Sequence, residues 1–214
     1  MGRVWGVVVA GGSGSRFGEA KQFVSLAGRP VAERSVAACR SVCDRVVLVV
    51  PRGATSEAHG ADIVVEGGTS RAASVRAGLA ALSDEVGIVV VHDAARPLAR
   101  HELFTAVVAA LSGDAAGAIP AVEVSDTVKR VRRDGSDATV LETLDRSELV
   151  AVQTPQAFRL DALRRAHQGD PDATDDAALV EALGLRVVVV PGDPENLKLT
   201  TPADLVRAEF LAGR

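Results

Sequence analysis

Residues 4–18 read VWGVVVAGGSGSRFG, and this segment is the strongest single indication of the architecture. Its first half is a continuous apolar run, which is typical of a strand buried on both faces rather than on one. Its second half carries four glycines in eight residues. Such a loop turns tightly, approaches a ligand closely and offers backbone N–H groups to an anion. The segment therefore predicts a buried strand that leads into a phosphate-binding loop, with a plain connecting turn as the alternative.

The rest of the chain repeats this pattern of a short apolar run followed by an alanine-rich segment of helical length. Continuous apolar strands that alternate with helices are typical of an α/β fold, a three-layer α/β/α arrangement around a mostly parallel sheet. Ligands of such folds bind beyond the carboxyl ends of the strands. We expect strands at residues 45–50, 62–65, 86–91, 116–121 and 186–190, and helices at residues 30–43, 69–83, 100–111, 174–183 and 202–211.

Length and composition narrow the class of protein. The 214 residues, 47% of them hydrophobic, are expected to form one domain at residues 1–214. The net charge of −4 gives no indication of nucleic-acid binding, and no apolar run approaches the roughly 20 residues that span a bilayer. Residues 1–9 lack the pattern of a signal peptide, which favours a cytoplasmic location. Cys39 and Cys43 are expected to be small core residues rather than metal ligands.

A polar stretch at residues 126–144 interrupts the alternation of strands and helices. Its central Asp134-Gly135 pair, between two extendable segments, is a hairpin signal. We therefore expect a protruding β-hairpin arm at about residues 126–148. Because an isolated hairpin is only marginally stable, the arm is expected to rest on another surface. A second subunit of a homodimer is the favoured candidate, and a solvated hairpin is the alternative.

Two common nucleotide-binding motifs fail in the glycine-rich loop. A P-loop places lysine directly after its second glycine, whereas Lys21 follows Ala20 and precedes Gln22. The dinucleotide fingerprint, counted from Gly12, requires a glycine where Phe17 stands. An NAD-dependent dehydrogenase is therefore disfavoured.

The loop instead resembles that of the sugar nucleotidyltransferases, with Gly-Gly-x-Gly-x-Arg and then a Lys-Gln pair. Further strings resemble one family among them, the 2-C-methyl-D-erythritol 4-phosphate cytidylyltransferases of the non-mevalonate route to isoprenoids. These strings are GGTSRAASV at residues 67–75, HDAARP at residues 92–97, TPQ at residues 154–156 and NLKLT at residues 196–200. The resemblance implies a Rossmann-like nucleotidyltransferase fold that binds CTP and a polyol phosphate.

The resemblance also assigns roles to individual residues. It implies the catalytic residues Arg16, Lys21 and Lys198. It implies CTP-binding residues at Ala10, Gly11, Gly12, Gly14, Gly68, Thr69 and Ser74. It implies acceptor-binding residues at Arg96 and Thr154, together with Thr127 and Arg146 from the partner subunit. Arg71 stays open between a binding residue and an ordinary helix-start residue.

Asp93 is the implied metal ligand. It follows an apolar strand, and its carboxylate suits Mg²⁺, which binds few carboxylates together with phosphate oxygens and water. A helix cap is the alternative for a lone aspartate at this place. His92 is expected to be structural. The Thr174-Asp175-Asp176 string is expected to supply the N-cap and the acidic first-turn residues of a helix, and the resemblance also places Thr174 at the edge of the site.

These assignments predict transfer of CMP from CTP to the acceptor phosphate, with release of pyrophosphate. An ionised phosphate oxygen is already a nucleophile, so the reaction needs positive charge and alignment rather than a catalytic histidine or cysteine. The residues leave the acceptor open between 2-C-methyl-D-erythritol 4-phosphate and ribitol 5-phosphate, and they leave the base contacts at Thr69 and Ser70 open. A non-catalytic nucleotide-binding module is the rival class, and the presence of every charged position argues against it.

Overall fold

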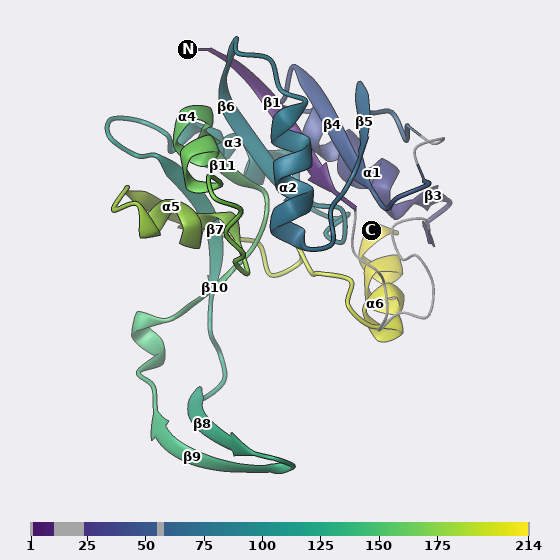
Figure 1. Ribbon diagram of the computed structural model, residues 1–214. Helices are drawn as coiled ribbons and strands as arrows, with labels where there is room; N and C mark the ends of the chain where they lie inside the picture. The colour runs from purple at the N-terminus through teal and green to yellow at the C-terminus, as the bar shows by residue number, and fades with distance from the viewer. Residues whose placement is uncertain (1, 11–23, 55–57, 214) are drawn as a thin grey trace.

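A computed structural model describes residues 2–10, 24–54 and 58–213. A central sheet of eight strands has helices on both faces (Figure 1). Its strands are β1 (Arg3–Val9), β4 (Arg45–Val50), β5 (Ile63–Glu66), β6 (Val86–Asp93), β7 (Gly117–Glu123), β10 (Val150–Val152), β11 (Gln156–Arg159) and β12 (Val187–Pro191). They are ordered β10-β7-β11-β6-β1-β4-β5, with β12 paired to β7.

The sheet is mostly parallel, as the continuous apolar strands predict. β1 pairs in parallel with β4 and β6, β4 pairs with β5, and β7 pairs with β12. Only β10 and β11 run antiparallel to their neighbours. Parallel pairing brings the carboxyl ends together, so that Val9 lies opposite Asp93 and Val50 lies opposite Glu66.

Two apolar clusters, one on each face, bury the sheet. Alternate residues of a strand point to opposite faces, so Val7 and Val9 join one cluster while Val8 and Ala10 join the other. A third, smaller cluster lies around Leu199. The first cluster includes residues of α2 (Arg71–Ala80), α4 (Leu160–Ala166) and α5 (Asp176–Ala182). The second cluster includes residues of α1 (Val31–Arg40) and α3 (His101–Ala109). The third cluster joins α6 (Pro202–Ala212) to β2 (Ser25–Leu26), which pairs with the equally short β3 (Arg29–Pro30).

Cys39 and Cys43 are buried free thiols in the second cluster, with their Sγ atoms 3.7 Å apart. Their hydrogen bond and their burial raise the pKa of the Cys39 thiol. Their position confirms the prediction that they are small core residues.

The predicted hairpin is present as β8 (Lys129–Asp134) and β9 (Asp137–Thr143), which pair only with each other in an arm that extends away from the main sheet (Figure 1). The two loop residues are Gly135 and Ser136, one position later than the predicted Asp-Gly turn. Gly135 has a φ of 58°, and a positive φ at the first of two loop positions fits a type II′ hairpin turn. A 3₁₀ turn at Arg146–Glu148 leads the chain back to β10.

The ends of the other predicted elements shift by up to three residues, and no element was predicted at β2, β3, β10, β11 or α4. β10 and β11 are short, and β11 is held by pairing with strands more than 30 residues away, which no local pattern reveals. No helix among the described residues is long and apolar enough to cross a membrane.

Candidate active site

Three predicted site segments meet at the carboxyl edge of the sheet. Ala10 follows β1, Gly67 follows β5 and Asp93 ends β6. Backbone hydrogen bonds tie Ala10 and Gly67 to the end of β4, since Ala10 N donates to the Val49 carbonyl and Gly67 N donates to the Val50 carbonyl, each at 2.7 Å. The residue after Asp93 is tied to β1, since Ala94 N donates to the Val9 carbonyl at 3.0 Å. The edge where these segments meet is the expected binding region of a parallel α/β sheet.

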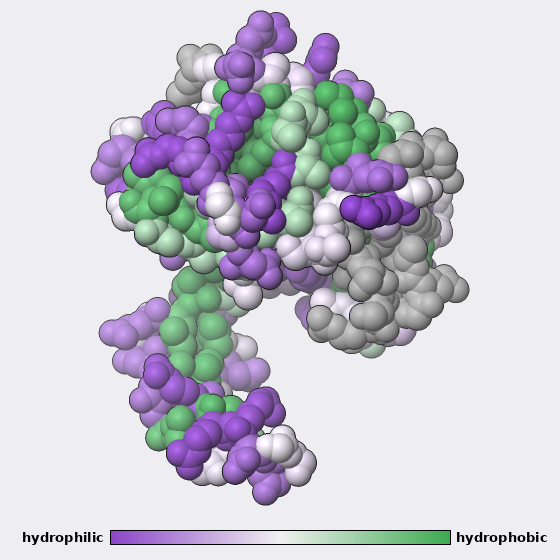
Figure 2. Space-filling model, in the orientation of Figure 1, coloured by the Kyte–Doolittle hydropathy of each residue, from purple (hydrophilic) through white to green (hydrophobic). Residues whose placement is uncertain are grey.

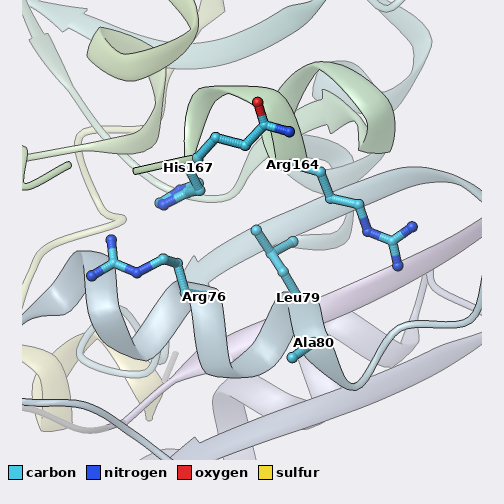
Figure 3. A pocket seen from close by; sticks show the side chains of 6 residues that line it. Arg76, Leu79, Ala80, Arg164 and His167 are labelled. Atoms are coloured by element: carbon cyan, nitrogen blue, oxygen red, sulfur yellow. The ribbon is translucent and has the colours of Figure 1, made fainter. Parts of the chain in front are cut away.

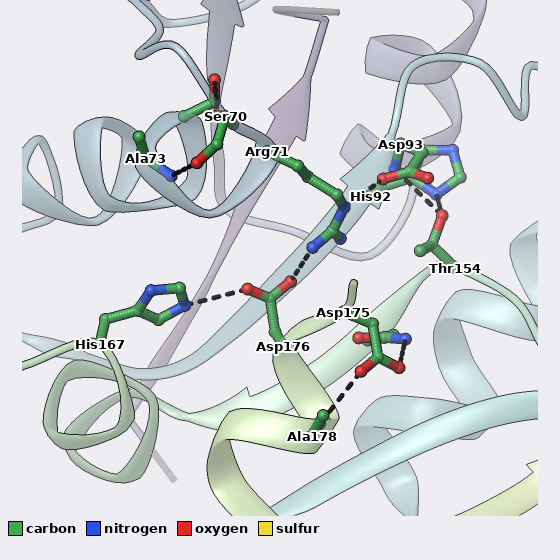
Figure 4. A network of polar contacts seen from close by, with 12 residues as sticks. Ser70, Arg71, Ala73, His92, Asp93, Thr154, His167, Asp175, Asp176 and Ala178 are labelled. Atoms are coloured by element: carbon green, nitrogen blue, oxygen red, sulfur yellow. Dashed lines mark hydrogen bonds and ion pairs between the residues drawn. The ribbon is translucent and has the colours of Figure 1, made fainter. Parts of the chain in front are cut away.

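The turn from β5 into α2 depends on its two glycines. A Cβ on Gly67 would lie 2.7 Å from Ser74 Oγ, and one on Gly68 would lie 2.4 Å from the Ala73 Cβ. Ser70 is the N-cap of α2 and accepts from Ala73 N, while the buried Ser74 hydroxyl donates to the Ser70 carbonyl (Figure 4). Within the turn, Gly67 is buried, Gly68 is half-buried and Thr69 is exposed, and Arg71 at the start of α2 reaches Asp93.

Asp93 lies between two cations. Arg71 Nε donates to its Oδ1 at 3.1 Å, and Lys198 Nζ donates to its Oδ2 at 2.7 Å. Burial by itself raises the pKa of the Asp93 carboxyl, but the charges of Arg71 and Lys198 outweigh burial and hold it well below its usual range. Asp93 is therefore an ionised carboxylate at neutral pH.

The segment after β12 places Lys198. Buried Asn196 donates to the Thr154 carbonyl at 2.9 Å, and Leu199 N donates to the Ala95 carbonyl at 2.8 Å. These bonds fix the chain on both sides of Lys198. The structure thus brings together Asp93 and Lys198, which lie 105 residues apart.

His92 and Thr154 form a hydrogen-bonded chain behind Asp93 (Figure 4). Burial lowers the pKa of His92 to about 4, so the ring is neutral. Its Nε2 lies 3.1 Å from the Arg96 carbonyl, which only accepts, so Nε2 carries the proton. Nδ1 then accepts from the Thr154 hydroxyl, and Thr154 Oγ1 accepts from Asp93 N. His92 is thus structural, as predicted, and Thr154 has no proton left for a substrate phosphate.

Arg96 is half-buried beside this chain. Its Nη1 donates to the Asn196 carbonyl at 2.7 Å, and burial lowers its pKa. Its Nε is buried and has no hydrogen-bond partner among the described residues. A half-buried guanidinium with an unused donor suits an anion.

Asp176 is the expected acidic residue in the first turn of α5, and it also has a role that the sequence did not indicate. The N-cap of α5 is Asp175, whereas Asp176 is buried and accepts from Arg71 Nη1 and from His167 Nε2 (Figure 4). Arg71 is accordingly more than a helix-start residue, because it bridges Asp93 and Asp176. The only local signal was an acidic pair at a helix start, which capping explains equally well.

The remaining predicted residues lie on the arm or outside the described part of the chain. Thr127 and Arg146 are exposed at the base of the arm, and Arg146 Nη1 donates to the Ser125 carbonyl. Gly11, Gly12, Gly14, Arg16 and Lys21 lie outside the described residues.

The described residues fit a divalent metal that arrives with its nucleotide. They contain no group of three or more His, Cys, Asp or Glu side chains that could hold a metal ion. Mg²⁺ commonly uses one or two carboxylates and completes its shell with substrate phosphates and water. The ionised Asp93, beside the predicted CTP turn, has the chemistry for that single protein ligand.

A mostly parallel α/β sheet with a Gly-Gly turn, a carboxylate and a lysine at its carboxyl edge is typical of a nucleotidyltransferase. The family model described as IspD, 2-C-methyl-D-erythritol 4-phosphate cytidylyltransferase, matches residues 4–214. The chain belongs to this family of isoprenoid biosynthesis and is a cytidylyltransferase.

Individual relatives agree. The chain is 44% identical over 221 residues to the 2-C-methyl-D-erythritol 4-phosphate cytidylyltransferase of Frankia casuarinae, an alignment that covers 99% of this chain and 82% of that protein. It is 45% identical to the bifunctional enzyme IspD/IspF of Clavibacter michiganensis, over 97% of this chain and 54% of that enzyme. Among solved structures, 2-C-methyl-D-erythritol 4-phosphate cytidylyltransferase from Thermus thermophilus superposes with a TM-score of 0.83 and 35% identity, covering 100% of both chains.

Proposed function

We propose that this chain transfers the cytidylyl group of CTP to 2-C-methyl-D-erythritol 4-phosphate through the site at the carboxyl end of β6. The observation that carries the proposal is the convergence of Asp93 and Lys198, whose Oδ2 and Nζ atoms lie 2.7 Å apart, with Arg71 at the start of α2 bound to the other Asp93 oxygen. Membership of the family favours this acceptor over ribitol 5-phosphate and favours an enzyme over a binding module.

The chemistry requires two anions to meet. At an effective dielectric of about 20, two unit charges 4 Å apart repel by about 4 kcal/mol. We assign Lys198 to the charge that develops on the reacting phosphoryl group, and Arg16 and Lys21 to the departing pyrophosphate. Ala10, Gly11, Gly12 and Gly14 would hold the triphosphate, and Gly68 and Thr69 the cytidine. Ser74 would support the cytidine through the turn, because it is buried and its hydroxyl donates to the Ser70 carbonyl.

Asp93 is the proposed ligand of Mg²⁺, which would neutralise the triphosphate when bound. Its carboxylate is ionised because Arg71 and Lys198 stabilise the charged form. The Asp93 position is also fixed from behind, since its backbone N–H donates to Thr154 Oγ1 at 3.0 Å.

The acceptor would lie between Arg96 and Thr154. The unpartnered Nε of Arg96 suits the acceptor phosphate. Because the Thr154 proton is engaged by His92, Thr154 would accept from a hydroxyl of the polyol rather than donate to its phosphate. This division assigns a charged donor to the phosphate and a neutral acceptor to the alcohol.

The arm is proposed to complete this site in a homodimer, with Thr127 and Arg146 reaching the partner's acceptor. The arm exposes Val131, Val140 and Leu141, and a band of apolar residues runs along it in Figure 2. Exposed apolar patches of this kind mark interaction surfaces. Residues 1–214 would then be one nucleotidyltransferase domain whose arm, at about residues 126–148, reaches over the neighbouring subunit.

A mixing experiment tests the arm. Arg146→Ala and Lys198→Ala are each expected to be nearly inactive alone. If the arm acts on the partner's site, a mixed dimer contains one intact site, and an equal mixture after exchange recovers about a quarter of wild-type activity. No recovery in a mixture shown to exchange subunits would place Arg146 in its own subunit's site, or in neither.

A cytoplasmic location and the absence of nucleic-acid and membrane partners complete the proposal. CTP is a cytosolic nucleotide, and the two cysteines are unpaired thiols, which is usual in a reducing compartment.

Pyrophosphate release from CTP and Mg²⁺ tests the reaction, with either 2-C-methyl-D-erythritol 4-phosphate or ribitol 5-phosphate as acceptor and a blank without acceptor. Release with the erythritol compound alone is expected. Release with ribitol 5-phosphate alone would show that the enzyme uses that acceptor instead. If folded protein released no pyrophosphate with either acceptor, the proposal would be overturned.

A further inference from the structure

Asp176 is a buried carboxylate with a task other than helix capping. Its neighbour Asp175 caps α5 by accepting from Ala178 N at 3.0 Å. Asp176 is only 1% exposed, and both of its oxygens are used, Oδ2 by Arg71 Nη1 at 2.8 Å and Oδ1 by His167 Nε2 at 2.9 Å. Burial of a carboxylate is costly unless it is paired and hydrogen-bonded, so this arrangement constrains Arg71 strongly.

Arg71 carries that constraint into the active site. Its guanidinium also donates from Nε to Asp93 Oδ1 at 3.1 Å, so it spans two carboxylates (Figure 4). Burial by itself lowers the pKa of Arg71, but the charges of Asp93 and Asp176 outweigh it and raise the pKa. Arg71 is the first residue of α2 and directly follows the proposed CTP turn.

We propose that Asp176 is a positioning residue that holds Arg71 and thereby keeps Asp93 able to bind the divalent metal carried by CTP. The inference rests on the proposed role of Asp93. Arg71 and Lys198 with Asp93 and Asp176 form a group of two positive and two negative formal charges, so that Asp176 balances Arg71 and keeps the group around Asp93 neutral. Without the charge of Asp176, Arg71 and Lys198 leave the group around Asp93 net positive, and a positive group repels the metal ion.

His167 supports Asp176 from the side of α4. It lies in a pocket of about 260 Å³ between α2 and α4, together with Arg76, Leu79 and Arg164 (Figure 3). Arg76 and Arg164 are already paired with Asp170 and Asp84, at 3.0 and 2.9 Å. We therefore assign this pocket no ligand, and its side chains serve to hold the imidazole that donates to Asp176.

Asp176→Asn is the sharpest test, because it removes one charge and almost no volume. His167 Nδ1 has no hydrogen-bond partner among the described residues, so the ring can change tautomer and accept from the new amide without loss of the fold. Asp175→Asn is the matched control, since it removes the neighbouring carboxylate at the same helix start. Titration calorimetry then measures CTP binding without acceptor, once in EDTA and once in Mg²⁺.

For Asp176→Asn we expect the Mg²⁺ concentration that half-saturates CTP binding to rise on the order of tenfold, the effect of one charge-assisted contact. CTP binding in EDTA should stay within about twofold of wild type, and Asp175→Asn should match wild type in both. An unchanged metal dependence in folded Asp176→Asn overturns the inference. An equal loss in EDTA and in Mg²⁺ also overturns it, because a merely structural defect would weaken both.

Two more variants separate this inference from the proposed site. If Asp93→Asn keeps the wild-type metal dependence, the metal role of Asp93 is wrong. If Asp93→Asn loses that dependence while Asp176→Asn keeps it, only the positioning role is wrong. Arg71→Lys cannot span both carboxylates, so combining it with Asp176→Asn should add little to either single change.

Discussion

Lys198 allows a prediction in which activity and stability separate. Lys198→Met removes the ammonium group and keeps most of the aliphatic stem. A unit charge about 4 Å from the charge that develops on the phosphoryl group is worth about 4 kcal/mol at an effective dielectric of about 20. Its removal should therefore lower kcat by about 10²–10³, the usual cost of one preorganised charge.

The same substitution should barely change the stability. The Lys198 side chain is 42% exposed, and its partner Asp93 keeps its second ion pair with Arg71. Ion pairs with one exposed partner contribute about 0–1 kcal/mol, which in a chain of this size shifts the melting temperature by at most about 2–4 °C.

The assay is pyrophosphate release at saturating CTP and acceptor, with thermal unfolding measured on the same preparation. Arg186→Met is the matched control, because Arg186 forms an exposed ion pair with Asp114 at 2.7 Å. The two residues precede β12 and β7, where we propose no contact with a substrate. It should keep wild-type turnover. Wild-type turnover in Lys198→Met, or a loss of turnover that follows a loss of folded protein, would refute the reasoning.

Three further predictions concern two glycines whose Cβ positions are blocked by neighbouring atoms and one carboxylate with a lowered pKa. Gly68→Ala places a Cβ 2.4 Å from the Ala73 Cβ, so the turn must move and the KM for CTP should rise by about tenfold or more, with the KM for the acceptor unchanged. Gly6→Ala places a Cβ 2.2 Å from Cys39 Sγ and should cost about 1–3 kcal/mol of unfolding free energy, part of which Cys39→Ala should restore in the double variant. Hydrogen bonds from the threonines before α6 lower the pKa of Asp204 from 3.8 to about 2. The ionised carboxylate therefore contributes its full stabilisation above pH 3.8, and this contribution is lost as the pH falls towards 2. In urea unfolding, the free energy of unfolding of Asp204→Asn should decline less over that pH range than the free energy of wild type.

The sequence predicts most of the fold because its signals are local. The runs of valine in β1, β4 and β6 are typical of strands that are buried on both faces. The Asp-Gly pair in the arm favours a hairpin turn regardless of the position of the arm in the fold. β11 escapes prediction because four residues, Gln156–Arg159, form a strand only through pairing with β6 and β7. Their own sequence carries no alternation to identify them.

The site was predicted unevenly for a similar reason. Asp93 and Lys198 stand in distinctive strings, so the resemblance could single out each of them, and the structure brings their side chains together. Asp176 stands in a helix start that capping explains, and its true partner Arg71 lies 105 residues away. The hydroxyl of Thr154 was found, but the direction of its hydrogen bond depends on His92 and the Arg96 carbonyl, which only the folded chain brings together.

The two partners of Asp93 differ in how firmly they are held, and that difference indicates which one moves when substrates bind. Lys198 is 42% exposed, so water can replace Asp93 around its ammonium group at little cost. Arg71 is 22% exposed and is also bound to the buried Asp176, and separating a buried ion pair costs several kcal/mol. CTP with its metal should therefore draw Lys198 away from Asp93 and leave Arg71 in place. The cation that the reaction needs would then be freed by the arrival of the substrate it acts on, while the carboxylate that receives the metal keeps its position.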